Sequence, residues 1–133
     1  MISKISISST IFETLFRAKE IVDNEYQEAK DWITDILENE HRDKKNECEI
    51  CRSPIKLEVH HIRGRSHGNE VITVCLECHR KLTDKHRLWN YQNSEILLER
   101  GIIDICELKH ERTGIGIYKR IAEYLTSRYP VIL

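Results

Sequence analysis

Hydrophobic side chains recur every three or four residues in the first part of the chain, from Ser9 to about Glu40. This spacing is that of an amphipathic helix, so we expect residues 9–40 to be helical. Asp23 and Asn24 favour caps and turns, and the helix can divide there. The stretch ENEHRDKKNE, residues 38–47, is almost entirely polar and predicts a linker. The repeating apolar positions are Ile11, Leu15, Ala18, Val22, Ala29, Ile33 and Ile36.

The pattern changes between residues 48 and 78, where polar and apolar positions begin to alternate. The segments IKLEVHHI and NEVITVC are rich in β-branched residues, and the glycine-bearing RGRSHG lies between them. Alternation on both sides of a glycine turn predicts a β-hairpin. From Cys78 to about Tyr91 the spacing of apolar residues is again helical.

Two further helices are predicted over residues 94–111 and 116–129, with a break at the glycines near residue 115. A hairpin surrounded by helices places the chain in the α+β class. At 133 residues the chain is long enough for one domain. Within it we distinguish an N-terminal helical segment (1–45), a central segment (46–92) and a C-terminal helical segment (93–133).

The distribution of apolar residues also predicts where in the cell the protein is found. No apolar run approaches the roughly eighteen residues that a membrane-spanning helix needs. Glu13, Arg17 and Lys19 interrupt the N-terminus before a signal-peptide core could form. We therefore expect a soluble, cytoplasmic protein with no membrane partner.

The net charge of −1 hides an uneven distribution. Residues 52–92 contain eight Lys or Arg and four Asp or Glu, a balance of +4, so the remainder carries −5. A basic centre in an acidic frame suits a polyanion that touches one face, and the alternative is a charged surface that is simply solvated.

Four of the five cysteines form two close pairs, Cys48-x-x-Cys51 and Cys75-x-x-Cys78, with 23 residues between the pairs. Two cysteines at this spacing can turn onto one ion, and the quartet is typical of a tetrahedral structural zinc site. Such a site contributes on the order of 10–16 kcal/mol to folding. The alternative is four buried or disulfide-linked cysteines. A zinc held by four thiolates has no open position, so any chemistry must come from other residues.

Three histidines are candidates for that chemistry. His60 and His61 end the first predicted strand and must face opposite sides of it. His79 follows Cys78 at the start of the next helix, so the zinc ties it to the hairpin. One strand histidine could therefore face His79 and hold a divalent cation with it, while the other takes a proton from water.

The pattern CEIC…LEVHHI…GN…VITVCLECH resembles the HNH endonuclease motif of the ββα-metal nucleases, in a form joined by a four-cysteine zinc. The resemblance covers about residues 46–90. It implies a zinc-stapled hairpin-plus-helix core, flanked by helices, that hydrolyses phosphodiester bonds of double-stranded DNA and leaves a 5′-phosphate. By the same resemblance His60 and His79 hold the catalytic ion, His61 is the general base and Asn69 orients the base. The ion would be Mg²⁺, Mn²⁺ or another transition metal.

The chain departs from the family pattern in three places. The loop after the double histidine has neither the proline nor the second glycine common in the family. Glu70 stands where the central asparagine is expected, and the one-residue slip to Asn69 reverses the strand face unless the hairpin carries a bulge. Thr83 occupies the position of a further ligand in many members, and His86 is expected about 10 Å beyond His79 along the helix.

Arg63, Arg65 and Lys81 are the candidates for nucleic-acid contacts, because guanidinium and ammonium groups suit phosphate oxygens. A solvated loop is the alternative for the two arginines. A homodimer is compatible with the sequence, since one metal site cuts one strand. The rival function is a non-catalytic zinc module that binds nucleic acid or a protein. A zinc deaminase is excluded, because its His-x-Glu and Pro-Cys-x-x-Cys motifs are missing.

Overall fold

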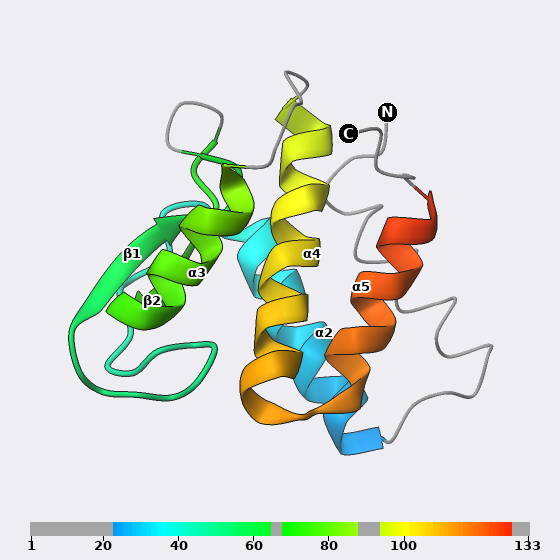
Figure 1. The fold of residues 1–133 in the computed structure, drawn as a ribbon, viewed down its shortest axis with the longest axis horizontal. Coiled ribbons are helices and arrows are strands. Elements are labelled where there is room, and N and C mark those ends of the chain that lie inside the picture. The colour runs from blue at the N-terminus through cyan, green and yellow to red at the C-terminus, as the bar shows by residue number, and fades with distance from the viewer. Residues whose placement is uncertain (1–22, 65–67, 88–93, 129–133) are drawn as a thin grey trace.

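The computed structural model describes residues 23–64, 68–87 and 94–128 (Figure 1). Within these ranges the chain is α+β, as predicted, with four helices and one two-stranded antiparallel sheet. The first part of the predicted N-terminal helix, residues 9–22, and the predicted helix end at 88–91 lie outside the described residues. The elements are α2 (Asp23–Glu38), β1 (Leu57–His61), β2 (Val71–Cys75), α3 (Leu76–His86), α4 (Ser94–Thr113) and α5 (Gly116–Arg128).

The predicted hairpin is present, and its register is continuous. Leu57 pairs with Cys75 at one end and His61 with Val71 at the other. Beyond the strands, the Ile62 amide donates to the Glu70 carbonyl at 3.0 Å, which extends the same register by one pair. These pairs contain no bulge, so alternation assigns His60 and His61 to opposite faces of the sheet.

The segment predicted as a linker, residues 38–47, and the cysteine turn after it are hydrogen-bonded along the outer edge of β2. The Lys45 amide donates to the Thr73 hydroxyl at 2.8 Å. In the turn, the Glu49 amide donates to the Thr73 carbonyl at 2.8 Å, and the Thr73 amide donates to the Glu49 carboxylate at 2.6 Å. The Arg42 guanidinium donates to the Val71 carbonyl at 3.0 Å and pairs with Glu49 and Asp35, each at 2.7 Å. This cover explains why all five residues of β2 are buried, because an exposed edge strand would leave backbone groups without partners.

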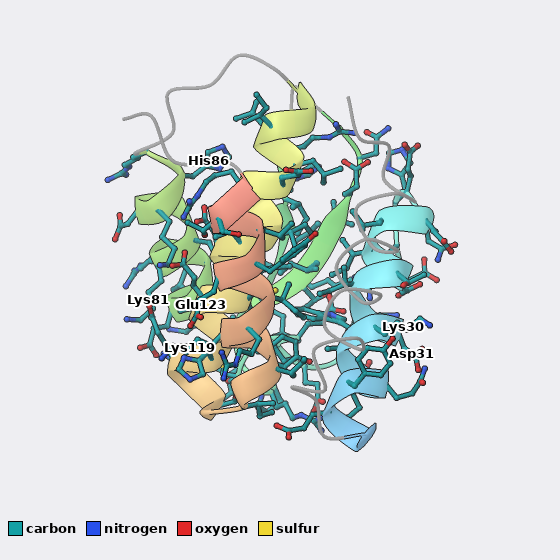
Figure 2. The ribbon with its side chains drawn as sticks, turned by 90° about the vertical axis from the view of Figure 1, so that its right-hand side faces the viewer. Lys30, Asp31, Lys81, His86, Lys119 and Glu123 are labelled. Atoms are coloured by element: carbon teal, nitrogen blue, oxygen red, sulfur yellow. The ribbon has the colours of Figure 1, made fainter. Side chains whose placement is uncertain are left out.

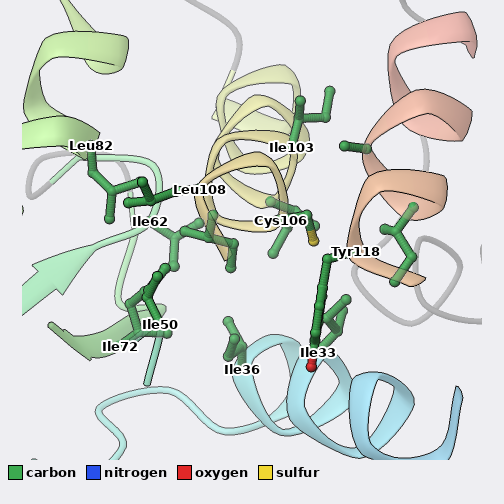
Figure 3. Packing of buried hydrophobic residues seen from close by; sticks show 14 of the residues in the cluster. Ile33, Ile36, Ile50, Ile62, Ile72, Leu82, Ile103, Cys106, Leu108 and Tyr118 are labelled. Atoms are coloured by element: carbon green, nitrogen blue, oxygen red, sulfur yellow. The ribbon is translucent and has the colours of Figure 1, made fainter. Parts of the chain in front are cut away.

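One hydrophobic cluster joins the hairpin to the helices, and it includes residues from all three predicted segments (Figure 3). Helix α4 lies between α3 and α5 (Figure 1). A Cβ at Gly101 of α4 would lie 2.3 Å from the carbonyl oxygen of Ile62, so only glycine permits this close approach to the hairpin. The labelled core residues are Ile33, Ile36, Ile50, Ile62, Ile72, Leu82, Ile103, Cys106, Leu108 and Tyr118.

Every helix among the described residues is too short or too polar to cross a lipid bilayer.

Replacing Glu49 with alanine should reduce the free energy of unfolding by about 3–5 kcal/mol, because it leaves the Arg42 guanidinium, 5% exposed, without its main partner. Urea unfolding measures this loss. Glu47→Ala is the matched control, since Glu47 is exposed and its removal should change stability by no more than about 0.5 kcal/mol. A similar small loss for both variants would contradict the structural role of Glu49.

Candidate metal centre and histidine site

The four paired cysteines converge, as their spacing predicts. Their sulfur atoms all lie within 4.8 Å of one another, and none of the four forms a disulfide. The sulfurs of Cys51 and Cys75 are 3.6 Å apart. Zinc–sulfur bonds of 2.3 Å in a tetrahedron place the sulfurs about 3.8 Å apart. The geometry and the donor type therefore fit zinc.

The local backbone explains how each pair reaches this point. In the first pair, the Cys51 amide donates to the Cys48 sulfur at 3.4 Å, and the Arg52 amide donates to the Cys48 carbonyl at 2.8 Å. Arg52 has a left-handed backbone, with φ of 67°, which closes this turn. In the second pair Cys75 is the N-cap of α3 and accepts from the Cys78 amide at 3.5 Å. The partial positive charge of a helix N-terminus favours a thiolate there.

The thiols differ in acidity because their surroundings differ. Burial raises the pKa of Cys48 and of Cys78. Burial also disfavours the Cys51 thiolate, but hydrogen bonds from the Ser53 amide and from neighbouring cysteines outweigh it and lower the pKa to about 7. Cys51 is partly exposed, whereas the other three cysteines of the group are buried. Thiols that still carry a proton must lose it when a metal binds.

Helix α4 supplies cations beside the thiolates. Lys109 lies with its Nζ atom 4.2 Å from the centre of the Trp32 ring, and it donates to the Glu49 carbonyl. Burial lowers the pKa of Lys109, and the nearby charge of Arg52 lowers it further, whereas the Cys48 thiolate opposes the shift. Arg112 pairs with Glu77 at 2.7 Å, and its pKa is raised by that hydrogen bond and by the Cys78 and Cys51 thiolates. These cations offset the net charge of −2 that four thiolates and Zn²⁺ would carry.

His60 and His79 lie side by side between the hairpin and α3. Their ring centres are 5.4 Å apart, with the ring planes at 75°. His60 is 7% exposed. Burial, together with the charges of His79, His86 and His61, lowers the pKa of His60 to about 3. His60 is therefore a neutral imidazole at physiological pH, the form that binds metals.

The other two histidines are near this pair but placed differently. His61 is half-buried, and it leaves β1 on the face opposite His60. His86 ends α3, and the helix spacing predicted that it lies too far away to share an ion with His79. Its charge nevertheless contributes to the low pKa of His60, so it belongs to the surroundings of the site. Figure 2 shows His86 at the end of α3.

Asn69 and Glu70 are the two residues at or next to the position where the HNH motif has its central asparagine. Asn69 is exposed, and its carbonyl accepts from the His41 amide at 3.1 Å. Glu70 is fully buried, and its two carboxylate oxygens accept from Arg63 at 2.8 and 3.0 Å. A Cβ at Gly68 would lie 2.2 Å from the Arg63 Nε atom, so a larger residue there would displace the Arg63 side chain. The base-orienting role of Asn69 stays a prediction.

The three residues predicted to contact nucleic acid differ in their surroundings. Arg63 has its guanidinium turned to Glu70 and a side-chain exposure of 12%, so it has a structural partner within the loop. Arg65 lies outside the described residues. Lys81 is exposed on the outer side of α3 (Figure 2). Their contacts with phosphate stay predictions.

Sequence reasoning missed Glu58, which contacts His79. An oxygen of its carboxylate lies 3.4 Å from the His79 Nδ1 atom. The available signal was its position two residues before His60, which puts both side chains on one face of a strand.

Comparison with known proteins finds no matching family model, no matching curated protein and no matching solved structure.

Replacing Cys78 with serine should reduce the zinc content from about one ion per chain to near zero and disorder the hairpin, because the site closes the sheet onto α3. Elemental analysis and amide NMR spectra measure both effects. Cys106→Ala is the control, since Cys106 lies buried in α4 and is not one of the four converging cysteines. Equal zinc contents in the two variants would contradict the assignment.

Zinc binding should release at least two protons per ion at pH 7. Burial raises the pKa of Cys48 and Cys78, so both thiols keep their protons at this pH until the metal displaces them. The apparent zinc affinity must then rise with pH. Zinc titrations of the metal-free protein with a pH indicator count the protons, and a pH-independent affinity would contradict this account.

Proposed function

We propose that this chain is a metal-dependent HNH-type endonuclease that hydrolyses phosphodiester bonds of double-stranded DNA. The observation that supports it most is the approach of His60 to His79, on a hairpin and a helix that the four cysteines join. In this proposal the hairpin and α3 form a ββα-metal core, and the remaining helices support it.

His60 and His79 are the residues that would hold the catalytic ion. His60 is neutral and buried, and His79 is half-buried beside it, so the pair offers two imidazole ligands with one side toward solvent. Imidazole ligands suit manganese, cobalt, nickel or zinc, and magnesium is compatible when water fills most of its shell. When bound, a divalent ion stabilises the charge that develops on the scissile phosphate and its leaving oxygen.

His61 is the proposed general base. It follows His60 directly, so the strand turns its side chain away from the His60–His79 pair. In-line displacement needs the attacking water and the leaving oxygen on opposite sides of the phosphorus. His61 would accept the proton of the attacking water, on the side opposite the leaving oxygen.

A recess with exposed cations beside it adjoins this site. Its volume is about 190 Å³, and besides His79 it is lined by two arginines and two carboxylates, Arg80, Arg87, Glu58 and Asp84. Arg80 is exposed next to the exposed Lys81, so α3 presents cations close to the recess. Phosphates of a DNA backbone could be bound there while one phosphate reaches the histidines.

The rival function, a non-catalytic zinc module that binds nucleic acid or a protein, needs the four-cysteine site but gives the histidine pair no task. Metal-dependent cleavage therefore separates the two functions.

Supercoiled plasmid incubated with the zinc-loaded protein and added Mg²⁺ or Mn²⁺ should be nicked or linearised. His61→Ala should reduce the rate by about 10²- to 10⁴-fold, the usual contribution of a general base, without loss of zinc. His110→Ala is the matched control and should cut like the wild type, because His110 lies on α4 beside Lys119 and Glu123 of α5. If the wild type binds DNA but does not cut it with any added metal, the proposed nuclease activity is overturned and the rival function is favoured.

A further inference from the structure

His79 contacts two side chains of β1, the ring of His60 and the carboxylate of Glu58. Glu58 and His60 are two residues apart on β1 and pair with Val74 and Ile72, so their side chains share one face of the hairpin. Helix α3 lies over this face and carries His79. The oxygen Oε2 of Glu58 is 3.4 Å from Nδ1 of His79, and the two side chains are 43% and 29% exposed.

This contact distinguishes the two nitrogens of His79. A neutral imidazole carries one N–H group and one lone pair, and a carboxylate accepts from the N–H. With Nδ1–H directed at Glu58, the lone pair lies on Nε2. Histidines that bind metals commonly donate their other N–H to a carboxylate in this way, which fixes the ring and makes it a better ligand.

The distance between Glu58 and His79 is longer than that of a strong hydrogen bond. A charge-assisted hydrogen bond is typically about 2.7–2.9 Å long, so 3.4 Å is a loose pairing. Such contacts tighten when the site takes up its ligand.

The donor-atom spacing does not favour Glu58 as a direct ligand of an ion held by His60 and His79. Among the described residues, the four cysteines form a group whose donor atoms all lie within 4.8 Å of one another, whereas Glu58, His60 and His79 do not.

We infer that Glu58 is a positioning residue, which holds His79 as the Nδ1–H tautomer so that Nε2 is the metal-binding atom. The metal part of this inference rests on the proposed function, but the tautomer of His79 does not.

Nitrogen-15 NMR of the imidazole side chains tests the tautomer in the zinc-loaded protein at about pH 8, where an ordinary histidine is neutral. Wild-type His79 should carry its proton on Nδ1. Glu58→Ala should transfer the proton to Nε2, whereas Glu58→Gln should retain the wild-type tautomer, because the amide oxygen still accepts a hydrogen bond.

Asp84→Ala is the matched control, since Asp84 lines the same recess but pairs with Arg87. It should leave the His79 signals unchanged. A wild-type His79 protonated on Nε2, or a His79 tautomer that Glu58→Ala does not change, would overturn the inference.

Calorimetric titration of the same zinc-loaded proteins with Mn²⁺ tests the metal. Glu58→Ala should bind Mn²⁺ about 10- to 100-fold more weakly than the wild type, the usual effect of losing such a partner, and Glu58→Gln should recover most of the affinity. Equal affinities in wild type and Glu58→Ala would overturn the positioning role. A wild type that binds no Mn²⁺ would instead overturn the proposed catalytic ion, and the tautomer measurement would still decide the role of Glu58.

Discussion

The convergence of Cys48, Cys51, Cys75 and Cys78 is the constraint on which the rest of the structure depends. A two-stranded hairpin is marginally stable in water, and this one is only five residue pairs long. The cysteines join the turn before β1 to the point where β2 becomes α3. A metal at this point would fix the direction in which α3 leaves the sheet, and with it the position of His79 over His60.

Residues around the cysteines also hold the hairpin in place. Arg42 and Glu49 close the free edge of β2, and Gly101 lets α4 approach the far end of β1. Lys109 and Arg112 bring positive charge from α4 to the thiolates. The hairpin is therefore held at its edge, at its far end and at the four cysteines, which leaves the face carrying His60 in a fixed relation to α3.

Local patterns in the sequence predicted most of the elements and the convergence of the four cysteines. The cysteine pairs, the alternation in β1 and β2, and the glycine break before α5 all depend on near neighbours, so spacing revealed them. The approach of His60 to His79 was also predictable, because the cysteines connect their two elements. Ion pairs between distant residues were not. The polar segment before Cys48 looked like a linker because nothing local shows that Arg42 meets Glu49 and the edge of β2. For the same reason no local pattern revealed the contact of Arg63 with buried Glu70 or that of Glu58 with His79.

The central claim is that the neutral His60 and its neighbour His79 form a second metal site, separate from the four cysteines. Anomalous diffraction from crystals of the zinc-loaded protein soaked in Mn²⁺ tests it most directly. The account predicts two metal positions, with zinc among the four sulfurs and manganese bonded to a nitrogen of His60 and to Nε2 of His79. A single zinc position, with the histidine pair free of manganese, would contradict it.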